Sequence, residues 1–113
     1  MLPFSFRFRL RENSDAFFAN ARGFRQKHIT LLAKKIEISN ITCAFSIKKK
    51  LGNAVVRALA RRRVRHAFME LMKENPTWKT LSYECLVIIY PSLQKYETYK
   101  NELEVALQQL ADW

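Results

Sequence analysis

The chain has 113 residues, of which 49% are hydrophobic, and it carries a formal net charge of +10. This length allows one domain with a modest core and excludes two, and the hydrophobic content excludes a disordered basic tail. The charge predicts an anionic partner, which is a nucleic acid, an acidic protein or an anionic membrane surface. We therefore expect a single domain over residues 1–113, with residues 1–11 as an extended arm.

Two absences in the sequence bear on location. The longest purely apolar run, Cys85–Tyr90, is far shorter than the roughly twenty residues of a membrane span, and Pro3 and alternating arginines replace an apolar signal core. Cys43 and Cys85 lie in separate apolar runs without metal-ligand spacing or a disulfide pattern. Buried free thiols suit a reducing compartment. We predict a soluble cytoplasmic protein with no membrane partner.

The N-terminal part predicts an extended segment and then a helix. Aromatic or apolar residues alternate with polar ones over residues 4–11 with a period of two, which is typical of an arm or an edge strand. Its arginines favour an arm that grips RNA, and its apolar side equally favours a strand packed on the domain. A helix should begin at Asn13 or Ser14, run to about Ala21 and be ended by Arg22 and Gly23.

The remaining chain predicts three strands and two further helices. Strands are expected at His28–Ile38, Asn40–Lys48 and Tyr83–Pro91, and helices at Asn53–Met72 and Tyr96–Leu110. These elements indicate an α+β fold, in which a small mixed β-sheet with a split βαβ arrangement is covered by N- and C-terminal helices. The last helix has an apolar stripe of Tyr99, Leu103, Ala106, Leu107 and Leu110, and an acidic outer face of Glu97, Glu102 and Glu104.

The basic residues are concentrated in one segment. Phe45–Phe68 holds eight of the twenty basic residues, and no Asp or Glu occurs between Glu37 and Glu70. Residues 38–69 therefore carry +8, whereas residues 70–113, with four basic and seven acidic residues, carry −3. Like charges without interleaved acids repel one another. The segment therefore needs an external anion, which favours nucleic acid over a merely solvated face.

A helix at residues 53–72 would arrange these charges in a row. Arg57, Arg61 and Arg65 fall at i, i+4 and i+8, about 6 Å apart along the axis, with Arg62 further round. Asn53 is the predicted N-cap, so Lys48, Lys49 and Lys50 lie beside a helix N-terminus that favours phosphate oxygens. The arginine row lies on the flank that adjoins the predicted core face, which is formed by Val56, Leu59, Ala60, Val64, Ala67, Phe68 and Leu71.

The sequence offers no catalytic constellation. His28 and His66 have no partner at a spacing that suggests a dyad. There is no phosphate-binding glycine-rich loop, no nucleophile elbow, no HExxH pair and no group of carboxylates suited to Mg²⁺. We expect no catalytic residue, no metal site and no cofactor on the protein.

The segment KKKLGNAVVRALARRRVRHAF, residues 48–68, resembles the signature of the bacterial ribonuclease P protein subunit. That signature has a lysine pair, a Gly-Asn-Ala-Val turn, an Arg-Asn-Arg triplet and a Lys-Arg pair. Ala58 and Leu59 replace the Asn and the second Arg of the triplet, Lys48 replaces a small polar residue, and Arg63 replaces an apolar one. The matching residues are Lys49, Lys50, Gly52, Asn53, Ala54, Val55, Arg57, Arg61, Arg62 and Arg65.

The resemblance implies a function for a protein that lacks chemistry of its own. In the family, a catalytic RNA subunit holds Mg²⁺ and removes the 5′ leader of precursor tRNA, and the protein binds that RNA and the leader. It also implies a left-handed βαβ crossover and no obligate protein partner. The implied contacts to the RNA subunit are Lys48, Lys49, Lys50, Asn53, Arg57, Arg61, Arg62 and Arg65. The implied leader-cleft residues are Phe17, Phe18, Arg22 and Thr30, although phenylalanines at helical spacing are more often core residues.

Two other functions remain open. One is a general RNA chaperone or a ribosomal-type RNA-binding protein without associated cleavage. The other is a DNA-binding regulator that lays the arginine-rich helix in a major groove. Against the regulator, the exposed side of this helix has few side chains suited to reading base edges.

Overall fold

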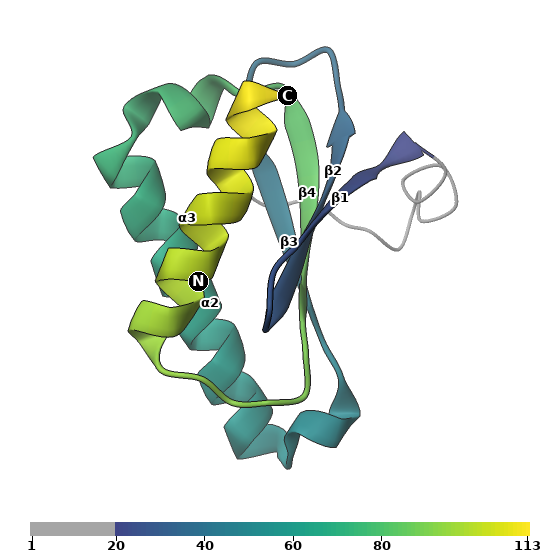
Figure 1. Cartoon of the computed structure of the whole chain (residues 1–113), viewed down its shortest axis with the longest axis vertical. Helices are drawn as coiled ribbons and strands as arrows, with labels where there is room; N and C mark the ends of the chain where they lie inside the picture. The colour runs from purple at the N-terminus through teal and green to yellow at the C-terminus, as the bar shows by residue number, and fades with distance from the viewer. Residues whose placement is uncertain (1–19) are drawn as a thin grey trace.

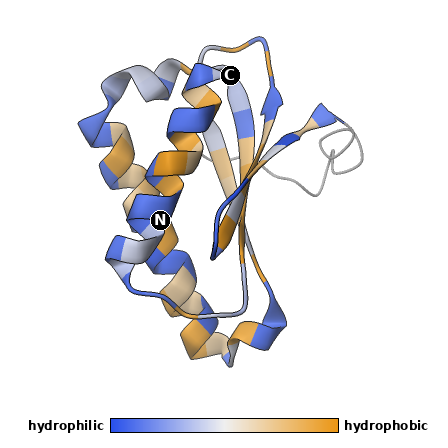
Figure 2. Cartoon of the chain, viewed as in Figure 1, coloured by the Kyte–Doolittle hydropathy of each residue, from blue (hydrophilic) through white to orange (hydrophobic). Residues whose placement is uncertain are grey.

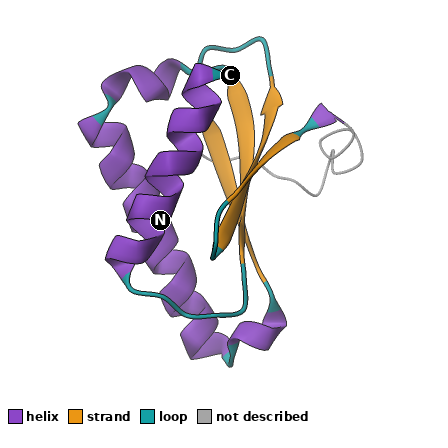
Figure 3. Ribbon diagram, in the orientation of Figure 1, coloured by secondary structure: helices purple, strands orange, loops and turns teal. Residues whose placement is uncertain are grey.

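The computed structural model describes residues 20–113. In this part of the chain, a mixed sheet of four strands forms one layer and two long helices cover one of its faces (Figures 1 and 3). The α+β class expected from the sequence is confirmed. The strands are β1 (Arg22–Arg25), β2 (Ile29–Lys35), β3 (Thr42–Ile47) and β4 (Tyr83–Ile89), the helices are α2 (Ala54–Glu74) and α3 (Tyr96–Asp112), and the 3₁₀ turns are η3 (Lys49–Leu51) and η4 (Pro76–Thr80).

The order of strands in the sheet is β1-β2-β4-β3. The late strand β4 lies between β2 and β3, antiparallel to β2 and parallel to β3, and Cys43 is the register partner of Cys85. The split βαβ prediction was wrong in this respect, because the parallel strands that α2 connects are direct neighbours. The left hand of that crossover stays a prediction.

Strand β1 is an element that the sequence did not reveal. Arg22 and Gly23 were expected to end a helix, but they begin this short edge strand, which pairs with β2 in antiparallel register. The predicted arm, the start of the predicted first helix, Phe17 and Phe18 lie outside the described residues.

The core lies between the sheet and the two helices. Ile29, Leu31 and Ala33 of β2 are fully buried, and β4 contributes Val87 and Ile89 to the same cluster. Figure 2 shows the hydrophobic sides of the helices turned toward the sheet. The predicted stripe of α3 is buried throughout, whereas on the predicted core face of α2 two residues, Val56 and Leu59, are only half-buried. Neither described helix is long and apolar enough to cross a membrane.

The other face of the sheet is not covered by α2 or α3. Because side chains alternate along a strand, this face carries Thr30 and Leu32 of β2, Leu86 and Ile88 of β4, and Ala44 of β3, which are register neighbours. Leu86 is nevertheless buried, and it does not belong to the main core cluster. We call this the open face.

A carboxylate anchors the turn between β1 and β2 to α3. Glu102 accepts hydrogen bonds from the backbone N–H of His28, at 2.7 Å, and from the ring Nδ1 of His28, at 2.5 Å. Glu102 was expected on the acidic outer face of the last helix, but it is half-buried and bonded to this turn. His28 is thus a structural residue that holds sheet and helix together.

Candidate nucleic-acid interface

The start of α2 is built by a short turn and a side-chain cap. After η3, Gly52 adopts a φ of 152°, where a Cβ would lie 3.1 Å from the Cβ of Val56. Glycine is therefore required at this position. The side-chain oxygen of Asn53 accepts the backbone N–H of Val56 at 3.0 Å, so the predicted N-cap is confirmed. Lys48, Lys49 and Lys50 are exposed beside it.

Replacing Asn53 by Ala should lower the free energy of unfolding by about 1 kcal/mol, because an early backbone N–H of α2 would lose its acceptor. Urea denaturation monitored by circular dichroism measures this change. Asn101→Ala, at an exposed position within α3, is the matched control and should not destabilise the protein. An Asn53→Ala variant as stable as the parent would show that the cap contributes nothing.

The basic residues of this region form a continuous feature, which we call the basic ridge: Lys48, Lys49, Lys50, Arg57, Arg61, Arg62 and Arg65. Arg61 and Arg62 are exposed, and Arg57 and Arg65 are half-buried. Within residues 20–113, the ion pairs are His28–Glu102, His66–Glu70 and Lys100–Glu74, and none involves the ridge. Its positive charge is therefore not neutralised by carboxylates of the described chain.

Arg57 is the most constrained member of the ridge. Its Nε is buried and has no hydrogen-bond partner in the described part of the chain. An unpaired buried donor is unfavourable by about 1–3 kcal/mol, and departures of this kind concentrate at functional sites. This Nε is therefore a donor that no described residue satisfies.

Arg63 does not belong to the ridge. Its Nη1 donates a hydrogen bond to the backbone oxygen of Gln94, in the loop before α3, at 2.6 Å. This arginine stands where the resemblance has an apolar residue. Here it ties α2 to the loop that leads into α3.

A second candidate surface lies on the open face. The hydroxyl groups of Thr30 and Tyr90 form a hydrogen bond, and the guanidinium of Arg25 lies 5.7 Å from the centre of the Tyr90 ring. Arg25 and Thr30 are register partners in adjacent strands. Thr30 was a candidate from the sequence. Arg25 and Tyr90 were not, because their contact depends on β1, which the sequence did not reveal.

Arg22 lies elsewhere. It shares the side of β1 that carries Phe24, and its guanidinium lies 4.8 Å from the ring centre of Trp113 and 5.6 Å from that of Phe24. Arg22 and Thr30 were both predicted leader-cleft residues, but the structure places them on opposite faces of the sheet.

The described residues hold no group of three or more His, Cys, Asp and Glu side chains that could bind a metal ion. Cys43 and Cys85 are buried, and burial raises the pKa of both thiols well above the usual value. They stay protonated and unreactive at neutral pH. The absence of catalytic residues and cofactors over the whole chain stays a prediction.

Comparison with known proteins decides the family. A sequence model of the family described as Ribonuclease P matches residues 2–111. The chain belongs to the ribonuclease P family. The ribonuclease P protein components of Streptococcus equi subsp. zooepidemicus and subsp. equi are 31% identical to it over 67 residues. Each match covers 59% of this chain and 56% of the relative, so the chain spans little more than half the length of these curated relatives.

Solved structures of ribonuclease P proteins share the fold. A Staphylococcus aureus ribonuclease P protein mutant with defective mRNA degradation activity is 20% identical, with a TM-score of 0.78 over 95% of this chain and 89% of that one. The ribonuclease P protein from Thermotoga maritima is 20% identical, with a TM-score of 0.77 over 91% of this chain and 96% of that one. The α+β fold with its four-stranded mixed sheet and two helices thus resembles that of ribonuclease P proteins.

Proposed function

We propose that this chain is the protein subunit of ribonuclease P, acting in the cytoplasm, and that it assists a catalytic RNA in removing the 5′ leader from precursor tRNA. The observation that carries the proposal is the basic ridge, which lies beside a capped helix N-terminus and lacks carboxylate partners in residues 20–113. Family membership supports the same assignment.

In this proposal the ridge binds the phosphate backbone of the RNA subunit. Lys48, Lys49 and Lys50 would meet phosphates together with the free N–H groups at the start of α2. Arg57, Arg61 and Arg65 would continue along the backbone at intervals of about 6 Å. Mg²⁺ and the cleavage step belong to the RNA. The protein adds positive charge, which reduces repulsion between the catalytic RNA and its anionic substrate.

The open face would hold the single-stranded leader. The bond from Thr30 fixes the hydroxyl of Tyr90 and so orients its ring, which leaves the ring as a surface on which a base can stack. Arg25 lies against this ring and can donate to an adjacent phosphate. Phe17 and Phe18 remain proposed leader contacts. The left-handed crossover is part of the same proposal, because it would keep the ridge outside the domain.

Reconstitution tests the proposed function. The chain is combined with its cognate large RNA at low Mg²⁺ and assayed on tRNA that carries a 5′ leader, with the RNA alone as the control. We expect cleavage to be stimulated at the junction that gives the mature 5′ end. Absence of stimulation, together with equal binding to unrelated structured RNAs, would favour the RNA chaperone.

The leader surface has its own prediction. Tyr90→Ala should weaken binding of precursor tRNA with a long leader by roughly tenfold, because one base–aromatic stack is lost, and should leave binding of tRNA without a leader unchanged. Filter binding with the reconstituted complex measures both. Lys27→Ala, at an exposed position in the β1–β2 turn, is the control for general effects. Equal losses with and without the leader would contradict this assignment.

A further inference from the structure

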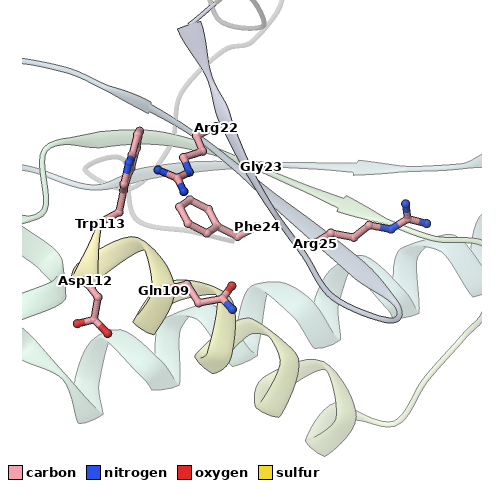
Figure 4. Close-up of a pocket in the computed structure, with 7 residues that line it drawn as sticks. All are labelled: Arg22, Gly23, Phe24, Arg25, Gln109, Asp112 and Trp113. Atoms are coloured by element: carbon pink, nitrogen blue, oxygen red, sulfur yellow. The ribbon is translucent and has the colours of Figure 1, made fainter.

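A hollow of about 600 Å³ lies between β1 and the last turns of α3 (Figure 4). We call it the β1–α3 hollow, and the residues that matter are Arg22, Phe24, Gln109, Asp112 and Trp113. Its volume is within the range of about 300–1,000 Å³ typical of small-ligand sites. Figure 1 places this end of α3 and the start of α2 at opposite ends of the molecule's long axis. The hollow is therefore separate from the start of the basic ridge.

One wall of the hollow holds a pre-oriented cation. The guanidinium of Arg22 lies against the rings of Trp113 and Phe24. The side chain is exposed and forms no ion pair with any acid of the described residues. Asp112 lines the same hollow without pairing with it. The aromatic contacts thus orient the planar guanidinium of Arg22. Its N–H groups can still donate hydrogen bonds to a ligand, and this arrangement is suited to a phosphate group.

The same wall offers an aromatic surface. Trp113 is 49% exposed, and its ring stacks on Tyr83, with the centres 5.7 Å apart and the planes 25° apart. The rings of Phe24 and Trp113 pack edge to face, with their centres 5.9 Å apart. Because Arg22 and Tyr83 both lie over the indole ring, a ligand would meet the exposed edge of Trp113.

Polar side chains form the facing wall. Gln109 projects from α3 on the side of Phe24, whereas the carboxylate of Asp112 is directed away from β1 (Figure 4). The amide oxygen of Gln109 accepts from Gln26 at 3.3 Å, so its amide N–H groups remain as donors. Asp112 accepts from Gln108 at 3.2 Å, and its carboxylate has further acceptor capacity. The amide of Gln109 can therefore donate to an acceptor on the edge of a nucleobase.

We propose that the β1–α3 hollow binds one unpaired nucleotide of single-stranded RNA, with a phosphate on Arg22, the base beside the exposed edge of Trp113, and the base edge at Gln109. An acidic peptide fits less well, because its carboxylates bring no planar base to the edge of Trp113 and no base edge to Gln109. The partner class rests on the proposed RNA-binding function, but the site is distinct from the basic ridge and from the open face.

The two tryptophans of the chain provide the test. In the ¹⁵N-labelled full chain, each indole N–H gives its own NMR signal, and Trp78 is buried whereas Trp113 is not. We expect a single-stranded RNA of about six nucleotides, within the span that small RNA-binding domains cover, to shift the Trp113 signal saturably and leave Trp78 in place. Arg22→Ala should weaken the affinity reported by Trp113 roughly tenfold.

Lys73→Ala, on an exposed part of α2, is the matched control and should leave the Trp113 titration unchanged. An unshifted Trp78 signal verifies that each variant is folded. The proposal is overturned if RNA shifts only signals of the ridge, if Arg22→Ala and Lys73→Ala titrate alike, or if a poly-glutamate peptide shifts Trp113 and RNA does not. No catalytic RNA is present, so this result and the reconstitution can fail independently.

Discussion

Replacing Arg61 and Arg65 together by Ala is expected to weaken binding to the catalytic RNA by at least about tenfold, since hydrogen bonds to charged groups are worth about 1.5–3 kcal/mol each. Neither arginine has a carboxylate partner within residues 20–113, so RNA phosphates are their expected acceptors. The dependence of binding on salt should also flatten, by roughly 0.7–0.9 log units per tenfold change in salt for each lost phosphate contact.

The control for this experiment removes the same charge elsewhere. Lys73 and Lys79 are exposed, and they lie at the end of α2 and in η4, away from the ridge. Lys73→Ala with Lys79→Ala should leave the salt dependence nearly unchanged. If both double variants change it equally, binding follows net charge alone and the ridge is not the interface.

The second large effect concerns stability. Phe68→Ala should lower the free energy of unfolding by about 3–5 kcal/mol, because it leaves a cavity in a close-packed interior. Phe68 is fully buried on α2 and meets the edge of the Phe45 ring, with the ring centres 6.5 Å apart. Urea denaturation at a fixed phosphate concentration measures the change, because bound anions would stabilise the native state separately.

Val55→Ala provides the comparison for Phe68. Val55 is 76% exposed on the same helix, and surface substitutions usually change stability by no more than about 0.5 kcal/mol. A loss below about 1 kcal/mol for Phe68→Ala would mean that this part of the core repacks freely, and that α2 is not rigidly held against the sheet.

The helices were predictable because their signals are local. Apolar spacing predicted the whole buried stripe of α3, and Asn53 marked the start of α2. Strand β1 gave no such signal, since its four residues, RGFR, include two arginines and a glycine. Its strand geometry depends on pairing with β2. The order of the strands was equally hidden, because alternation assigns side chains to faces but says nothing about which strands are neighbours.

The candidate site likewise has parts that local sequence signals predict and parts that depend on contacts between distant segments. The absence of acids and the helical period predicted the basic ridge as a row, and no ion pair among residues 20–113 involves it. The side on which Arg22 or Arg25 lies depends on β1, so neither could be placed. Arg63 bonds Gln94, 31 positions later in the chain, and no local pattern reports such a contact.

The central position of β4 has a consequence for how the protein forms during translation. Strand β3 pairs only with β4 among the described strands, and β2 does not pair with β3 at all. A nascent chain that has emerged only as far as α2 therefore exposes apolar strands without their partner, and pairing between segments distant in sequence is slow. We expect the sheet to close only after residues 83–89 leave the ribosome, so that α2 gains its full support from the sheet late in folding.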